Sequence, residues 1–354
     1  MLIEAVISSH RYERQGVSMR SKPVVPALAM SFLAANFAAP AGAGERHLAP
    51  GQVAEVLSLR PLIDTAEGIA VDRRGHIFIS NRRLENDVRV CEILERAPDG
   101  SMSVFATLDP AVADIFPAGI TGLALDAHDD LYAALPSFNP ATQGVWRIRR
   151  DGSARRLAGS KRMLLANALA FDTRGNLYVT DSIDGAIWRF PPNGRGRLWV
   201  RDPLLAPDPA IGANGIAFVP PDNLYVANLD RALIARIRIR PDGRPSRPEI
   251  AAAGFELLGI DGLAADAHGT LYAAIVVSAA LGTSPLVMVE PKTGKITAST
   301  ADHSSFDLPT SLAFGRGPLD HKSVFVVNSG FFPEGRPEAA PSVVQVGVGQ
   351  RGGN

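Results

Sequence analysis

The chain has 354 residues, with 36 Lys and Arg against 36 Asp and Glu, and 46% of its residues are hydrophobic. The apolar fraction excludes a wholly disordered chain. The formal net charge of zero gives no overall electrostatic footprint for nucleic acid or an anionic membrane. A single cysteine, Cys91, excludes an internal disulfide framework and a zinc cluster built from cysteines.

The N-terminal region has the pattern of a secretory signal. Arg20 and Lys22 follow Met19, residues 24–39 are apolar, and small residues fill positions 41–43. A basic start, an apolar stretch and small residues at a cleavage site are the three parts of such a signal. The pattern predicts export, to the periplasm or outside the cell, and no stable membrane insertion after cleavage.

This interpretation divides the chain into residues 1–43, an extension plus signal peptide with Met19 as the predicted start, and residues 44–354, a single domain. The alternative is a membrane anchor over residues 24–43. The prolines at positions 26 and 40 and the small residues that follow favour cleavage.

The remaining chain is built from six copies of one unit. The second residue of each copy serves as a marker, and successive markers are 54, 46, 47, 47 and 49 residues apart. The six markers are Glu67, Thr121, Asn167, Asn214, Asp261 and Thr310. A repeat of this length suits one four-stranded propeller blade.

The pattern inside each unit indicates β-strands. A short apolar segment such as residues 166–171 precedes a polar turn, and a second apolar segment such as residues 177–179 follows it. Alternating segments and turns of the Asp-Gly type come next. We therefore predict an all-β, six-bladed β-propeller with four-stranded antiparallel blades.

The two ends of the chain are predicted to close the ring together. Residues 342–346 fit a third strand of the last blade, and no further strand follows them. Residues 53–59 precede the first unit and fit the missing outer strand. An N-terminal strand that completes the last blade leaves no open sheet edge.

The markers predict a site in the central channel. Residues at equivalent places in the innermost strands form a ring around the axis, and here all six offer oxygen donors. Ca²⁺ and similar hard cations prefer such a set. Alternatively, Asn, Asp and Thr at the start of a strand form local bonds to the backbone. Their shared register across the repeats favours the metal site.

These motifs resemble those of the senescence marker protein/gluconolactonase/luciferin-regenerating-enzyme family of six-bladed propellers. The similarity spans nearly all of residues 50–348, chiefly as the repeat pattern, and is most specific at residues 66–68, at 214–217 with 224–227, and at 261–264. Diisopropyl fluorophosphatase and the paraoxonases are more distant relatives. Members of the family hydrolyse lactones, so the resemblance implies an exported lactonase-like hydrolase that acts on a small-molecule substrate.

The resemblance also implies ligands for a divalent cation, with Ca²⁺ favoured and Mn²⁺ or Zn²⁺ as alternatives. Matched motif by motif, Glu67, Asn214 and Asp261 hold the metal, and Asn167 contacts metal or substrate. Asp261 is the candidate general base, or the ligand that positions the attacking water. Asn167 and Thr121 are expected to orient the substrate.

This sequence departs from the family at two motif positions. Ala168 stands where relatives often have Asp, so a second acidic group is missing, and Ile260 replaces a frequent proline. We also find no match to the histidine pair of the paraoxonases. Three histidines in turns are expected to be solvated, and His303 lies in a loop that could reach the channel mouth.

Other functions remain open on the sequence alone. A non-enzymatic exported propeller of the NHL type would bind a ligand or a protein through its rim loops. A propeller like strictosidine synthase would work without a metal, but its acid catalyst has no place here. Nothing in the sequence indicates a nucleic-acid partner or names a protein partner.

Overall fold

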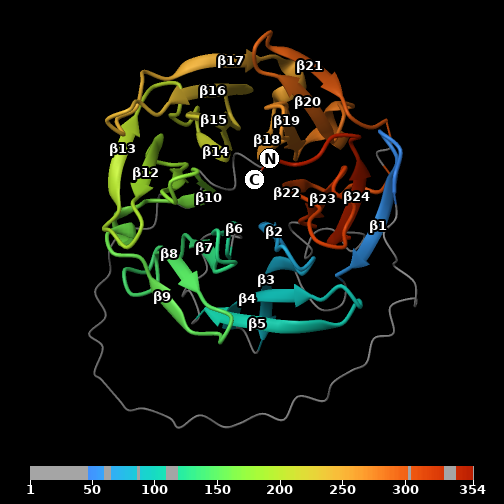
Figure 1. Ribbon diagram of the computed structural model, residues 1–354, viewed down its shortest axis with the longest axis horizontal. Helices are drawn as coiled ribbons and strands as arrows, with labels where there is room; N and C mark the ends of the chain where they lie inside the picture. The colour runs from blue at the N-terminus through green and yellow to red at the C-terminus, as the bar shows by residue number, and fades with distance from the viewer. Residues whose placement is uncertain are drawn as a thin grey trace.

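The computed structural model describes residues 47–59, 65–85, 88–108, 119–301, 304–330 and 340–353. These residues form six four-stranded antiparallel sheets arranged as blades around a central axis (Figure 1). The predicted all-β, six-bladed propeller is confirmed. No helix in the described part of the chain is long and apolar enough to cross a membrane. The predicted signal segment and His303 lie outside the described residues.

Each repeat contributes its strands in order from the axis outward. Blade one contains β2 (Ile69–Val71), β3 (Ile77–Glu85), β4 (Val88–Arg96) and β5 (Met102–Leu108), and blade two contains β6 (Gly122–Leu125), β7 (Leu131–Leu135), β8 (Gly144–Ile148) and β9 (Ala154–Arg156). Blade three contains β10 (Ala166–Phe171), β11 (Leu177–Asp181), β12 (Ala186–Phe190) and β13 (Arg197–Arg201). Figure 1 shows β2, β6 and β10 nearest the centre.

The second half of the ring repeats this arrangement. Blade four contains β14 (Ala213–Val219), β15 (Asn223–Asn228), β16 (Leu233–Arg238) and β17 (Glu249–Ala253). Blade five contains β18 (Ile260–Ala265), β19 (Leu271–Ile275), β20 (Leu286–Glu290) and β21 (Lys295–Ala298), with the short helix α2 (Ser278–Leu281) between β19 and β20. Blade six contains β22 (Pro309–Phe314), β23 (Ser323–Asn328), β24 (Ser342–Gly347) and β1 (Val53–Ser58).

The closure of the ring by the two chain ends is confirmed. β1 pairs antiparallel with β24, with Val53 opposite Val346 and Ser58 opposite Ser342. The N-terminal strand is therefore the outermost strand of blade six, and Figure 1 shows it in blue beside the red strands of the C-terminal end. This pairing satisfies the edge of β24 and joins blade six to both ends of the chain.

The core lies between neighbouring blades. Every residue of β11 is buried, whereas the outermost strand β13 is half-buried to exposed. Tyr132 of blade two packs with Leu169 and Val179 of blade three in one apolar cluster. Burial of such side chains between sheets is the main stabilising contribution, on the order of 25 cal/mol per Å² of apolar surface.

The two ends of the ring differ. At the marker end, each first strand begins and each second strand ends, because the two are antiparallel. At the opposite end, which we call the turn end, Asp172 Oδ1 accepts hydrogen bonds from the backbone N–H groups of Arg174 and Asn176. The predicted turn positions of His76, His128 and His268 are confirmed at this end.

Candidate functional site

The marker residues converge at one end of the central channel. Thr121, Asn167, Asn214, Asp261 and Thr310 line a common cavity of about 70 Å³, and the sixth marker, Glu67, precedes β2 beside it. In blades three to six the pairing of the first two strands shifts register at the marker. Such a bulge re-aims a side chain. The fold therefore brings the sequence-predicted site residues together.

Glycine follows several markers because the first strands approach one another closely. A Cβ atom on Gly122 would lie 2.2 Å from the Asn167 carbonyl oxygen, and one on Gly215 would lie 2.2 Å from the Asp261 carbonyl oxygen. Real Cβ atoms do not approach a backbone oxygen this closely. The Gly in the marker motif thus lets neighbouring blades meet at the axis.

The two threonine markers join adjacent blades. Thr121 Oγ1 donates to the Ala166 carbonyl oxygen at 2.9 Å, and Thr310 Oγ1 donates to the Glu67 carbonyl oxygen at 3.0 Å. Each hydroxyl proton is therefore engaged with the backbone of the next blade. The lone pairs of Thr121 Oγ1 are what it offers toward the channel. Its expected contact with substrate stays a prediction.

A serine at the marker end orients Asn167. Asn167 Nδ2 donates to Ser182 Oγ at 3.1 Å, and Ser182 Oγ donates in turn to the Ala213 carbonyl oxygen at 2.7 Å. The amide nitrogen is thereby fixed, and Asn167 Oδ1 is left as the acceptor that can serve a ligand. Ser182 was not a candidate from the sequence.

The two marker carboxyl groups, those of Glu67 and Asp261, both have raised pKa values. Burial raises the pKa of Glu67 well above its usual range, the charge of Asp261 raises it further, and the guanidinium of Arg82 opposes both effects. Burial also raises the pKa of Asp261 to about 8, against a lowering by the hydrogen bond from Asn214. A nearby cation would stabilise the ionised forms of both carboxyl groups, which otherwise repel each other.

Two buried side-chain oxygens in the ring, Glu67 Oε2 and Asn214 Oδ1, have no hydrogen-bond partner among the described residues. Leaving such atoms unsatisfied costs about 1–3 kcal/mol each. Together with Asp261 and Asn167 they form an all-oxygen donor set, which fits a hard divalent cation. The described residues contain no cluster of three or more His, Cys, Asp or Glu able to hold a metal. Amide oxygens would therefore complete any cation site here.

Arg82 is a channel-side residue that sequence reasoning missed. It lies on β3, is buried, and packs its Cβ against the Gly119 position that leads into blade two. Blade three has Ser182 at the equivalent place, two residues after the threonine that matches Ser80. Extending the repeat alignment to the end of the second strand would have identified it. The positive charge of Arg82 partly offsets the negative charge of the site at which a cation would bind.

The polar residues that end the second strands hold loops in place. Asp181 accepts hydrogen bonds from the backbone N–H groups of Leu164 and Leu165, directly before Asn167. Asn228 Nδ2 donates to the carbonyl oxygens of Leu204 and Ala206. These residues therefore act on the backbone around the site and not on the marker side chains.

Comparison with solved structures places the fold among known propellers. A regucalcin from Agrobacterium tumefaciens, described as a calcium-binding protein, aligns with TM-score 0.61 and 16% identity over 85% of this chain and 95% of that one. A gluconolactonase from Xanthomonas campestris aligns with TM-score 0.59 and 18% identity over 88% and 99%.

Other activities occur on similar propellers. A virginiamycin B lyase from Staphylococcus aureus aligns with TM-score 0.52 and 15% identity over 84% of this chain and 99% of that one. No protein-family model matches the chain, and no curated protein matches it. At these identities the likeness shows the fold. The neighbours nevertheless include gluconolactonase, luciferin-regenerating enzyme and regucalcin, the group that the motifs resemble.

Proposed function

We propose that the chain is a lactonase-like hydrolase that opens a small cyclic ester at the marker end of the channel. The observation that carries the proposal is the convergence of two buried, unpartnered oxygens, on Glu67 and Asn214, with the raised-pKa carboxyl of Asp261. The fold alone does not decide between functions, because propellers host many. The gluconolactonase-like neighbours support the choice of reaction.

Glu67, Asn214, Asp261 and Asn167 are the residues that would hold a divalent cation, and we propose Ca²⁺. A bound cation supplies a Lewis acid that polarises a carbonyl oxygen. The donor set favours a hard ion because all four side chains offer oxygen. The regucalcin neighbour is described as calcium-binding, which supports the choice of ion.

The protein's own groups would handle the proton and the substrate. A carboxyl whose pKa lies near 8 without a cation is poised for proton transfer close to neutral pH, so Asp261 is the proposed general base. Asn167 presents Oδ1 once Ser182 holds its nitrogen. Thr121 Oγ1 offers its lone pairs as acceptors, and the two residues would orient the ester ring.

Chemistry that depends on histidine fits less well. The Staphylococcus aureus lyase is described as catalytically inactive when one histidine is replaced by alanine. In the described part of this chain the five histidines, His47, His76, His128, His268 and His321, all lie near the turn end. Among the described residues, the marker end offers carboxylates and amides, which suit hydrolysis, and His303 lies outside these residues.

The test is hydrolysis of sugar, alkyl and aromatic lactones by the purified protein, with Ca²⁺, Mn²⁺, Zn²⁺ or a chelator present. We expect turnover that the chelator abolishes and one cation restores. Absence of turnover with every cation would overturn the proposal and favour a ligand-binding propeller. The measurement also ranks the substrates, because specificity resides in loops such as residues 137–143 and 204–211.

We propose further that the protein is exported, on the strength of the signal pattern around residues 19–43. N-terminal sequencing of the protein from the periplasm or the culture medium is expected to begin near residue 44. Recovery of the intact N-terminus in the cytoplasmic fraction would contradict export.

A further inference from the structure

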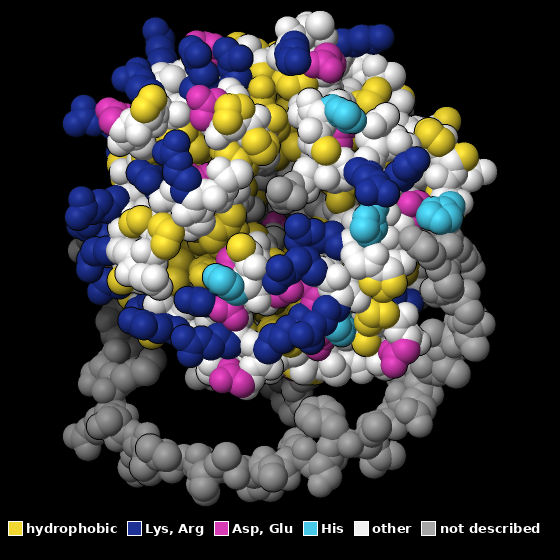
Figure 2. Space-filling model, in the orientation of Figure 1, with side chains coloured by type: hydrophobic (Ala, Val, Ile, Leu, Met, Phe, Trp, Pro, Cys, Tyr) yellow, Lys and Arg dark blue, Asp and Glu magenta, His cyan; other side chains and the backbone are white. Residues whose placement is uncertain are grey.

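The charges of this chain are unevenly distributed around the ring. Residues 144–249, which run from the third strand of blade two through blade three to the start of the outermost strand of blade four, carry 18 Arg and Lys against 10 Asp and Glu, although the whole chain is balanced. Figure 2 shows Lys and Arg side chains gathered along the left and lower left of the molecule, over these blades. A net charge of zero therefore conceals a strongly basic region.

The excess is concentrated at the turn end. The turns between the third and fourth strands of blades two, three and four span residues 149–153, 191–196 and 239–248. Residues 149–155, 195–197 and 238–247, which lie in these turns and at the adjoining strand ends, are what we call the basic rim. The basic rim contains nine arginines and two aspartates, and all nine arginines are exposed. Seven of the nine form no ion pair with a described residue. Their charge is therefore available to a partner.

Protection of sheet edges does not explain this distribution. Outer strands often carry charges that block edge-to-edge association. The outer strand β5 of blade one has no charged residue, and β1 of blade six has Glu55 alone. If edge protection were the cause, the six blades would share the arginines.

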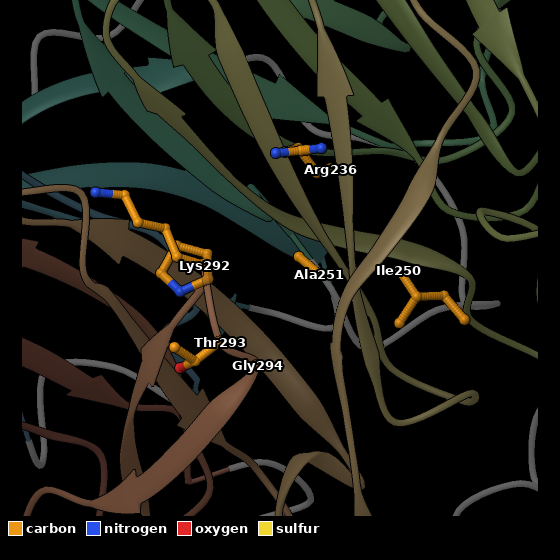
Figure 3. Close-up of a pocket in the computed structure, with 7 residues that line it drawn as sticks. Arg236, Ile250, Ala251, Lys292, Thr293 and Gly294 are labelled. Carbon is orange, nitrogen blue, oxygen red and sulfur yellow. The ribbon is translucent and has the colours of Figure 1, made fainter.

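A groove adjoins the basic rim between blades four and five. It has a volume of about 400 Å³ and is lined by Arg236, Ile250 and Ala251 from blade four and by residues 291–294 from blade five. Figure 3 shows Arg236 and Ile250 on the strands of blade four, with Lys292 and Thr293 on the neighbouring turn. Arg236 Nη2 is ion-paired with Glu249 Oε2 at 2.8 Å, so Lys292 is the lining cation without an ion pair among the described residues. The groove is large enough for a phosphate-bearing headgroup beside Lys292 and Thr293.

Exposed aliphatic side chains accompany the arginines. Leu198 on β13 is 42% exposed and Ile250 on β17 is 56% exposed, both on outermost strands beside the basic rim. Arginines together with exposed aliphatic groups suit a lipid surface. A surface for single-stranded nucleic acid would call for exposed aromatic rings, but Trp199 packs edge-on against Tyr178 and donates its Nε1–H to the Gly243 carbonyl oxygen.

We propose that the basic rim docks the propeller peripherally on an anionic phospholipid bilayer. Arginine guanidiniums would pair with lipid phosphates, the groove would receive a headgroup, and Ile250 and Leu198 would contact the acyl boundary. The marker end, at the other end of the ring, stays open to solvent. This proposal is independent of the lactonase activity, because binding is measured without any substrate.

The test is co-sedimentation of the full chain with vesicles of phosphatidylcholine alone or with 30% phosphatidylglycerol. The difference between the two vesicle types measures binding that depends on anionic lipid. We expect the phosphatidylglycerol vesicles to bind the protein and 0.5 M salt to release it, because screening weakens exposed charges. Equal binding to both vesicle types, or no binding to either, would overturn the proposal.

Two variants of equal charge separate the basic rim from net charge. The rim variant combines Arg149→Gln, Arg195→Gln and Arg240→Gln, one exposed arginine without an ion pair from each blade. The control combines Lys161→Gln, Arg162→Gln and Arg231→Gln, near the marker end of the same blades. Each basic residue near the surface typically changes affinity several-fold. The rim variant should therefore lose at least about tenfold, and the control less than about twofold.

Two further outcomes would refute the docking surface. If the rim variant and the control lose affinity equally, overall charge and not the basic rim is responsible. If duplex DNA binds more tightly than the vesicles, with the same dependence on the rim arginines, the surface is for nucleic acid. Far-ultraviolet circular dichroism of both variants checks that the propeller is intact.

Discussion

The marker position is used in two ways around the same ring. In blades two and six, Thr121 and Thr310 donate their hydroxyl protons to the backbone of the next blade. In blades one and four, Glu67 and Asn214 leave a buried oxygen without a partner. One repeated position therefore either joins blades through a hydroxyl or leaves a buried oxygen without a partner. Repetition of the fold does not mean repetition of the role.

The largest test of this contrast is Asp261→Asn. Loss of the proposed base and cation ligand should lower kcat/KM for the best lactone at least about 100-fold, because general acid–base groups contribute 10²–10⁴-fold. The control is Asp266→Asn, the same change just beyond the far end of the same strand, where Asp266 Oδ1 accepts two turn hydrogen bonds and Oδ2 accepts one from the Tyr272 hydroxyl. Equal losses in both variants would place the effect in folding.

Two asparagines of blade four sharpen the contrast at the level of cation binding. Asn214→Ala removes an unpartnered oxygen and should weaken Ca²⁺ binding at least about tenfold by calorimetry. Asn228→Ala removes hydrogen bonds to a loop and should lower the free energy of unfolding by about 1–2 kcal/mol while Ca²⁺ affinity is kept. The reverse pattern would show that Asn214 is structural.

The carboxylates predict how stability depends on pH. Without a cation, the raised pKa of Asp261, about 8 against an ordinary 3.8, means that the folded protein binds more protons than the unfolded chain between these values. The free energy of unfolding should therefore fall as the pH rises from 4 to 8. Added Ca²⁺ should raise Tm more at pH 8 than at pH 6, because ligands must be ionised.

Thermal unfolding of Asp261→Asn serves as the control for this pH profile. The variant should show a flatter dependence over the same window, since the titrating group is gone. A profile for the protein without cation that matches the variant's would show that Asp261 titrates at its ordinary pKa.

The smallest expected effects compare the two threonines. Thr121→Val and Thr310→Val each remove one hydrogen bond between blades and should lower the free energy of unfolding by about 1 kcal/mol. The Thr121 variant should also raise KM, because Thr121 is the proposed substrate contact. An unchanged KM in Thr121→Val, measured beside Thr310→Val, would show that Thr121 only links the blades by a hydrogen bond and does not contact the substrate.

The fold could be predicted from the sequence because all six repeats share the same pattern of strands and turns. The closure by residues 53–59 was also accessible, since the last repeat visibly lacked one strand. The site was predictable only as a set of positions. Whether a side chain faces the channel depends on bulges and on partners such as Ser182, which belong to other strands and other blades. Arg82 escaped notice because its repeat equivalents are not charged.

The net charge of the chain was the least informative property for predicting a binding surface. A chain with equal numbers of acidic and basic residues offered no footprint for an anionic surface, yet three successive blades carry an arginine excess. Average composition hides such asymmetry in a ring, because blades are separated in space as well as in sequence. Counting charge by repeat, once the repeats were known, would have revealed it.

The pairing of β1 with β24 determines which part of the propeller can fold last during synthesis. The first strand to leave the ribosome belongs to a blade whose other strands are synthesised last, more than 250 residues later. Blades one to five can assemble as they emerge, while β1 waits with an unpaired edge until β24 arrives. A chain that ends before residue 342 lacks β24, so β1 and β23 both keep an unpaired edge. Unpaired edges promote association between copies.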